Sequence, residues 1–292
     1  MKIYDCTTFH SEHMMMNVRF NILNEHVHKF IVVESLFSHS GEKKKLNFDI
    51  NNYPKFKDKI IYLVIDREPD DLINPLNENI QYKRINSIKR IELSYDFMMS
   101  EIKKLSDNDL IILSDNDEIP NLDSTQFKEG NSDIYIFKQL FFYYKFNLLY
   151  DRMYWFGSKA CTKKKLKSLS WLRNLKNKKY PFWRVDTFFS KKKSSSLKII
   201  NDGGWHFTNV MSAENLYTKM TNFGHHDEFE LSELSVEDLK IKINQGLVFY
   251  DHFAGQEDKN KWKFNYKLKK ISDNLLPDSL IKDKIKLKEW FN

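Results

Sequence analysis

The sequence contains few cysteines. Its 292 residues include only two, Cys6 and Cys161. Two cysteines cannot form the disulfide framework of a small secreted domain, and they cannot supply the ligand spacing of a structural zinc site. We therefore expect a chain that folds in a reducing compartment, with a cytoplasmic location.

Long hydrophobic runs are also missing. No stretch of about 18 consecutive apolar residues occurs, so no membrane-spanning helix is expected. The first residues, Met1 to Cys6, already have the pattern of a strand. They do not combine a charged region with a following apolar region, so no signal peptide is expected either. No internal repeat is found.

The composition is that of a folded globular protein. Hydrophobic residues make up 41% of the chain, and aromatic residues make up 15%, which excludes a disordered chain. This length allows one large α/β domain or two small ones, with a substantial core. The formal net charge of +7 favours anionic partners such as nucleotide phosphates, acidic membranes or nucleic acid, without choosing among them.

The stretch Asp109 to Pro120 places acidic residues directly after a buried strand. Its apolar run, Leu110 to Leu113, is typical of a strand covered on both faces of a sheet. The turn SDNDE follows at the carboxyl end of the strand, where open α/β sheets bind ligands. Asp115 and Asp117 can converge on one cation, and their hard oxygen atoms suit Mg²⁺ or Mn²⁺. The alternative is ordinary turn chemistry, in which Asp and Asn side chains bond to nearby backbone.

The first 120 residues alternate between strand and helix patterns. Strands are expected at Lys2–Cys6, Lys29–Glu34, Lys59–Ile65 and Leu110–Leu113, with helices at Ser11–Glu25 and Asn79–Leu105. Buried-type strands joined in this order predict an α/β fold with a Rossmann-like, mostly parallel central sheet and helices on both faces.

The pattern changes after Pro120, where aromatic-rich segments predominate. Strands are expected within residues 133–146, 153–162, 182–190 and 197–200, and helices at 212–222 and 236–245. The final segment, 259–292, is rich in lysine and carries interleaved aromatic residues. It is expected either to rest on an anionic membrane or to pack on the domain as an amphipathic helix.

Four blocks in fixed order carry a family resemblance. They are IYDCTTFHSE (3–12), FIVVESLFSHSGEKKKLNF (30–48), DLIILSDNDEIP (109–120) and GGWHF (203–207), with a weaker match at QYKRIN (81–86). With these blocks, the chain resembles glycosyltransferase family 17 over roughly residues 1 to 230. The resemblance implies a GT-A type fold, a divalent metal, a UDP-sugar donor such as UDP-N-acetylglucosamine (UDP-GlcNAc), and inversion at the anomeric carbon.

The resemblance also implies how the chain is divided into a catalytic domain and a tail. We expect one GT-A type catalytic domain at 1–258, with a nucleotide-sugar-binding half at 1–120 and an acceptor half at 121–258. A basic C-terminal helical tail at 259–292 follows. The expected partners are a UDP-sugar donor and a glycan, glycolipid or glycoprotein acceptor, without nucleic acid and with peripheral membrane contact through the tail.

The expected metal ligands for Mn²⁺ or Mg²⁺ are Asp115, Asp117 and His206. The metal would bridge the two phosphates of the donor and offset charge on the leaving UDP. Glu118 would orient these ligands. His206 follows a Gly-Gly turn, and its alternative role is a core histidine bonded to a backbone carbonyl.

Further donor contacts are expected at the ends of the first two strands, in the loop after the second strand and on the following helix. They are Asp5, Glu34, Ser35, His39, Ser40, Gly41, Lys45 and Arg84, together with Asp115. The loop would close on the donor and exclude water. Arg84 would neutralise the pyrophosphate, and its alternative is an exposed helix charge. Asp5 has the alternative of capping the following turn.

An inverting transfer requires one general base to deprotonate the acceptor hydroxyl. The sequence leaves several candidates open. Glu228 is the first and Asp186 the second, and each is also consistent with a surface carboxylate. Asp227, His225 and His226 are further alternatives.

Other functions fit the sequence less well. A metal-dependent phosphohydrolase or nucleotidyltransferase acting on a nucleotide would also place Asp residues after a strand, but a two-metal site needs more carboxylates. No second Asp-rich strand end is present. A nucleic-acid-binding protein would show a recognition motif and clustered basic residues, whereas here basic and acidic residues are mixed. An inactive transferase is disfavoured by the intact Asp-x-Asp.

Overall fold

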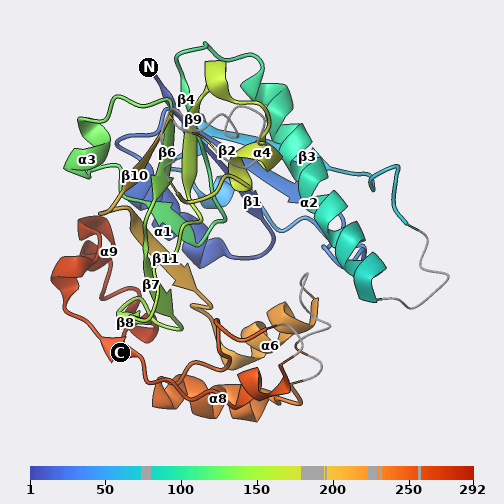
Figure 1. Cartoon of the computed structure of the whole chain (residues 1–292), viewed down its shortest axis with the longest axis vertical. Helices are drawn as coiled ribbons and strands as arrows, with labels where there is room; N and C mark the ends of the chain where they lie inside the picture. Colours follow the sequence, from blue (N-terminus) through green and yellow to red (C-terminus); the bar gives the residue numbers. More distant parts are fainter. Residues whose placement is uncertain (74–79, 179–193, 195, 223–228, 230–231, 256–257) are drawn as a thin grey trace.

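The computed structural model describes residues 1–73, 80–178, 194, 196–222, 229, 232–255 and 258–292, in which the strands form two sheets (Figure 1). The larger sheet has the strand order β10-β6-β9-β4-β1-β2-β3. Its strands are β1 (Ile3–Phe9), β2 (Lys29–Ser35), β3 (Ile60–Ile65), β4 (Leu110–Leu113), β6 (Ile134–Phe137), β9 (Lys159–Thr162) and β10 (Leu197–Ile200).

The smaller sheet lies beside the larger one and has the order β12-β8-β7-β11-β5. Its strands are β5 (Glu118–Pro120), β7 (Leu140–Tyr143), β8 (Leu148–Leu149), β11 (Gly204–Thr208) and β12 (Lys269–Lys270). The α-helices of the described residues are α1 (His13–Leu23), α2 (Ile80–Ile102), α3 (Thr125–Lys128), α4 (Leu169–Arg173), α6 (Ala213–Asn222), α8 (Val236–Gln245) and α9 (Asp278–Lys282).

Helices cover both faces of the larger sheet, because its central strands alternate between two apolar clusters. Phe30 and Val32 point into the cluster that contains residues of α1. Ile31 and Val33 point into the other cluster, with residues of α2 and α4. All four residues are at most 1% exposed. The predicted α/β fold with helices on both faces is therefore confirmed.

The prediction of a mostly parallel sheet is not confirmed, because the sheet is mixed. β4, β1, β2 and β3 run parallel, whereas β9 runs antiparallel to both β4 and β6. The chain leaves β6 at its carboxyl end, builds β7 and β8 of the smaller sheet and returns without a crossover helix. A strand that re-enters from this edge must run in the opposite direction.

The segment 259–292 wraps along the domain as short pieces and not as one continuous helix. β12 pairs with β8, and α9 contacts α1 (Figure 1). Leu276 and Leu280 are 5% and 2% exposed and belong to the same apolar cluster as α1. The tail therefore packs on the domain, through apolar contacts as well as strand pairing.

Across the described ranges, no helix combines the length and the apolar character needed to cross a bilayer. The longest of these helices, α2, is 23 residues long. It carries a basic residue at several positions, including Lys89 and Arg90. The strand expected at 182–190 lies outside the described residues.

Candidate active site

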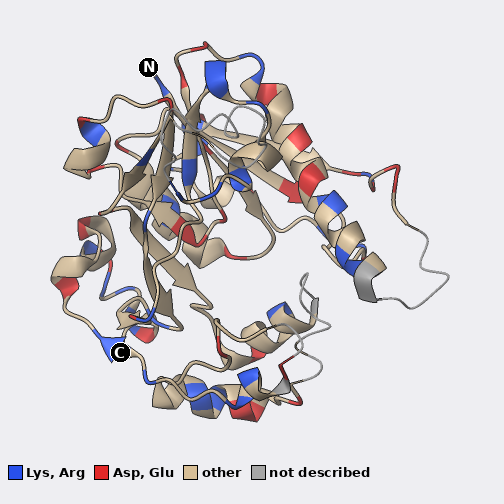
Figure 2. Cartoon of the chain, in the orientation of Figure 1, with Lys and Arg blue, Asp and Glu red and all other residues tan. Residues whose placement is uncertain are grey.

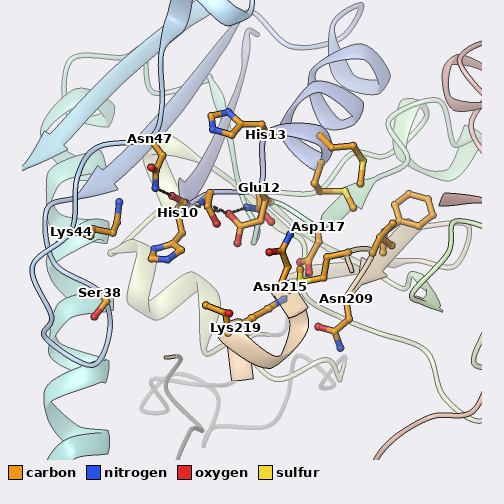
Figure 3. Close-up of a pocket in the computed structure, with 18 of the residues that line it drawn as sticks. His10, Glu12, His13, Ser38, Lys44, Asn47, Asp117, Asn209, Asn215 and Lys219 are labelled. Carbon is orange, nitrogen blue, oxygen red and sulfur yellow. Dashed lines mark hydrogen bonds and ion pairs between the residues drawn. The ribbon is translucent and has the colours of Figure 1, made fainter. Parts of the chain in front are cut away.

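A pocket of about 580 Å³ opens at the carboxyl ends of β1, β2 and β4 (Figure 3). Five segments form its wall. Residues between 10 and 15 lie after β1 and at the start of α1, residues between 38 and 47 lie in the loop after β2, and residues 116–117 lie in the turn after β4. The other two segments are the β11–α6 region, between residues 207 and 219, and Trp290. This volume lies within the range of about 300–1,000 Å³ for small-molecule sites. The position is where α/β sheets bind their ligands.

The pocket combines lysines with carboxylates. The lysines are Lys43, Lys44, Lys45 and Lys219, and the acidic residues are Glu12, Glu42 and Asp117. Lys44 belongs to the loop after β2 and Lys219 to α6, so positive charge reaches the pocket from two different elements (Figure 3). Several lysines around one cavity suit a ligand that carries phosphate groups.

Charge outside the pocket is mixed in sign. Basic and acidic residues are interspersed along α2 and α8 (Figure 2). Nucleic-acid binding proteins instead gather basic residues on one face or along one helix. The absence of a nucleic-acid partner stays a prediction.

Asp117 places its carboxylate in the pocket, next to two basic side chains. Its Oδ1 lies 3.5 Å from Nε2 of His206, and its Oδ2 lies 4.0 Å from Nζ of Lys219. Burial alone would raise the pKa of Asp117, but the charge and hydrogen bond of His206 and the charge of Lys219 lower this pKa to about 2. Asp117 is therefore an anion at neutral pH.

His206 lies beneath Asp117 on β11. Its ring stacks on Phe141, with centroids 4.8 Å apart and an interplanar angle of 3°, and it also contacts Trp155. Its Nδ1 is buried and has no hydrogen-bond partner among the described residues, so no bond from this nitrogen to a backbone carbonyl is found there. The backbone N–H of Phe207 donates to the carbonyl of Asp117 over 2.8 Å and joins β11 to the acidic turn.

Asp115, in contrast, is held outside the pocket wall by Arg173 of α4. Its Oδ2 accepts from Nη2 of Arg173 over 2.6 Å. Asp115 and Asp117 therefore point to different cationic neighbours, although they are two residues apart.

Glu118 fixes the backbone of the acidic turn. Its side chain is fully buried, and one oxygen accepts from the N–H of Asp115 and from Arg173, each over 2.9 Å. The other oxygen accepts from the indole N–H of Trp155 over 2.5 Å. Gly157 must lack a side chain here, because a Cβ would lie 2.0 Å from the Glu118 carboxyl group. Glu118 thus positions the turn that carries Asp117.

Arg19 also stabilises the acidic turn. The predictions from the sequence did not include this residue. This fully buried guanidinium bonds both carboxylate oxygens of Asp5, over 2.8 and 2.6 Å. It also donates to the carbonyls of Asp115 and Glu118, over 3.0 and 2.8 Å, and to the Ser114 hydroxyl over 2.7 Å. The signal was an arginine among the apolar residues of the first helix. Asp5 is therefore engaged by Arg19 and does not line the pocket.

Glu34 and Ser35 anchor the loop after β2. The buried Glu34 carboxylate accepts from Lys44 over 2.5 Å and from the backbone N–H groups of Asn47 and Phe48. The Ser35 hydroxyl accepts from the N–H of Phe37 over 3.0 Å. Glu34 and Ser35 thus hold the loop, while Lys45 lines the pocket, and the role of all three as donor contacts stays a prediction.

The tip of this loop is tied to α2. The carbonyl of His39 accepts from Ser87 over 2.9 Å and from Arg90 over 3.0 Å. Gly41 has φ +98°, and a Cβ there would lie 2.4 Å from Nη2 of Arg90. The Ser40 hydroxyl lies 2.7 Å from the hydroxyl of Ser38, which lines the pocket. Four of the predicted donor contacts do not belong to the pocket wall: His39, Ser40, Gly41 and Arg84 of α2.

Glu12 is a second residue that the sequence did not single out. It lies in the pocket, and its Oε2 accepts from the N–H groups of His10 and Ser11 and from the amide of Asn116. These bonds join the loop after β1 to the turn after β4 (Figure 3). Glu12 is the last residue of the first sequence block, and this position was the one sequence feature that could have indicated a functional role. Nothing in the sequence distinguished Lys219, which also lines the pocket.

The candidates for the general base, Glu228 and Asp186, lie outside the described residues. The alternatives Asp227, His225 and His226 lie there too. The described part of the chain therefore offers no test of their positions.

The described residues contain no group of three His, Cys, Asp or Glu side chains arranged to hold a metal. Asp117 and His206 are neighbours, but Asp115 pairs with Arg173. Mg²⁺ is usually bound through one or two carboxylates together with substrate phosphates. The donor set fits such an ion with Asp117 as its carboxylate, and Asp115 could join only if its ion pair with Arg173 opened.

Comparison with known proteins agrees with this arrangement. A family model for glycosyltransferase family 17 matches residues 1–255. No curated protein matches the chain. The matched range contains all four blocks and every segment of the pocket wall except Trp290. The chain therefore belongs to glycosyltransferase family 17, as its sequence blocks predicted, and the protein is a glycosyltransferase.

Proposed function

We propose that this glycosyltransferase is a metal-dependent, inverting enzyme that transfers N-acetylglucosamine from UDP-GlcNAc to a glycan, glycolipid or glycoprotein acceptor. The observation that carries the proposal is the ionised Asp117 carboxylate in a lysine-lined pocket at the strand ends. Family membership supports a sugar donor and a glycan acceptor in general.

A GT-A type fold is part of this proposal. Four strands of the larger sheet, β3, β2, β1 and β4, run parallel, and the acidic turn follows β4. The next strand along the chain, β5, belongs to the smaller sheet. β5 pairs with β11 and brings His206 beside the turn, since His206 is opposite Glu118 in this register. The acidic turn therefore connects β4 of the larger sheet to β5 of the smaller sheet.

The lysines of the pocket would bind the donor's pyrophosphate. Glu34 orients Lys44, and Lys43 and Lys45 lie on either side of Lys44 in the same loop. Asp117 would hold a Mn²⁺ or Mg²⁺ ion together with the phosphates, with His206 beside it. When bound, the ion would supply positive charge against the charge that develops on the leaving UDP. Glu118 and Arg19 keep the turn in place, so that Asp117 is preorganised.

The general base remains proposed as Glu228, with Asp186 as the second candidate. The base must lie within about 3 Å of the acceptor hydroxyl in the reactive complex. Replacing either carboxylate by its amide removes the proton acceptor with little change in shape.

Thermal unfolding with a panel of UDP-sugars tests the donor site. At about a hundred times its Kd, a ligand should stabilise the protein by roughly 2.7 kcal/mol, which raises the melting temperature by about 5 °C in a chain of this size. We expect this rise with UDP-GlcNAc and Mn²⁺, and its loss in Asp117→Asn.

The matched control is Asp107→Asn, because the Asp107 side chain is 73% exposed and precedes β4, at the opposite end of this strand from the turn. This variant should keep the full rise. If no UDP-sugar shifts the wild-type melting temperature at millimolar concentration, the donor site as proposed is wrong.

A further inference from the structure

The pocket wall includes a residue from the end of the chain. Trp290 lines the pocket together with residues of the loops after β1, β2 and β4. It lies outside residues 1–255, the part that matches the family. The wall of this site is therefore completed by a segment that the family match does not cover.

Local contacts hold Trp290 in place. Its carbonyl accepts from the N–H of Phe146 over 2.8 Å. Asn147 and Asn292 exchange two hydrogen bonds, over 3.0 and 2.8 Å, between the side chain of the first and the backbone of the second. The ring of Phe291 packs against Phe146 with centroids 5.5 Å apart. Contacts on both sides of Trp290 thus fix the backbone that carries the indole.

Trp290 has Lys145 over its ring, with Nζ 5.5 Å from the ring centroid, and apolar residues elsewhere around it. Phe146 packs edge-on against Phe207 with centroids 5.0 Å apart, and Phe207 lines the pocket. Trp290 packs against the cluster that contains Met15, Phe207 and Val210. These three residues also line the pocket. One part of the wall is therefore apolar and aromatic.

The opposite part of the wall is basic and polar. Lys44 and Asn47, on the loop after β2, lie across the pocket from Asn209, with Asp117 between them and Asn209 in the view of Figure 3. Asn209 follows β11 directly and belongs to the same side of the wall as Phe207 and Val210. Three of the four pocket lysines thus lie on the loop after β2, Lys219 of α6 lies 4.0 Å from Asp117, and the aromatic residues Phe207 and Trp290 come from β11 and the C-terminal segment.

We propose that Trp290 is a specificity-determining residue whose indole face stacks on a sugar ring of the acceptor. The inference rests on the proposed function, in which the donor's phosphates occupy the lysine side and the sugar is transferred near Asp117. The acceptor then approaches from the aromatic side. One face of a sugar ring carries C–H groups that suit an aromatic surface, while Asn209 and Asn215 offer amides to its hydroxyl groups.

Calorimetric titration tests this assignment with simple probes. The protein is first saturated with UDP and Mn²⁺, and the methyl β-glycosides of N-acetylglucosamine, mannose and galactose are then titrated. We expect wild type to bind at least one of them. Trp290→Leu, which keeps an apolar side chain but loses the flat face, should bind this glycoside at least about tenfold more weakly, and Trp290→Phe should recover part of the affinity.

Ile285→Ala is the matched control, since Ile285 belongs to the same C-terminal segment, is 87% exposed and does not line the pocket. It should bind the glycoside as wild type does, and all variants should bind UDP equally. The inference is overturned if Trp290→Leu keeps the wild-type glycoside affinity, if it weakens UDP binding instead, or if wild type binds no glycoside. Absence of UDP binding in wild type would instead contradict the proposed donor site.

Discussion

At the scale of single residues, buried charges position the acidic turn. Arg19 and Asp5 are both 0% exposed and form an ion pair beneath the turn, while Arg173 joins Asp115 to Glu118 above it. A buried charge is tolerated only when its partners are in place, because desolvation is otherwise uncompensated. These partners leave Asp117 as the carboxylate of the turn that lines the pocket.

Replacing Arg19 by Met should therefore destabilise the protein strongly. The variant leaves Asp5 buried without its cation and the carbonyls of the turn without their donor, which should cost about 3–5 kcal/mol. Urea unfolding measures this loss, with the exposed Arg67→Met as the control. Equal stability of the two variants would show that the buried pair does not hold the turn.

At the scale of elements, the loop after β2 has a rigid base and tip. Glu34 binds one end of the loop, and Arg90 of α2 binds the other through the carbonyl of His39. The lysines between these anchors face the pocket. The loop thus presents its positive charge from a backbone that is hydrogen-bonded at both ends, and its closure on the donor stays a prediction.

Gly41→Ala should disturb this arrangement. The residue has φ +98°, and the new Cβ would lie 2.4 Å from the Arg90 guanidinium, which Glu68 holds on its other side. Backbone strain of this kind costs about 1–3 kcal/mol, and a lower melting temperature should report it. Gly255→Ala provides the comparison, because a Cβ there meets nothing within 4 Å. If the two alanine variants have the same melting temperature, the tip of the loop is not constrained as described.

Local patterns in the sequence predicted the elements well. The apolar runs of β2, β3 and β4 appear within one or two residues of their expected bounds, because burial on both faces leaves few polar residues in a strand. The direction of β9 was not predicted, since it depends on the path of the chain through the smaller sheet.

Contacts between distant segments were harder to predict than the elements. Asp115 meets Arg173, 58 positions away, and Trp290 reaches the pocket from the end of the chain. Such contacts arise from tertiary packing, and no local spacing encodes them. Asp117 and His206 lie 3.5 Å apart, and only the sequence blocks linked these two distant segments.

At the scale of the whole molecule, one pocket gathers the ends of three parallel strands, the β11–α6 region and the C-terminal segment. The pocket wall therefore includes residues from His10 to Trp290, and its completion depends on the tail that packs beside α1 and β8. A pocket formed by such distant segments requires the complete fold.

Release of UDP from UDP-GlcNAc, measured in the presence of a glycan acceptor, tests the central claim most directly. Wild type with Mn²⁺ should release UDP and form a product of inverted anomeric configuration. Chelation of the metal, or Asp117→Asn, should lower the rate by at least about a hundredfold, the scale of losing one preorganised electrostatic contact. An Asp117→Asn enzyme with wild-type rate, or full activity after chelation, would contradict the metal-dependent donor site at Asp117.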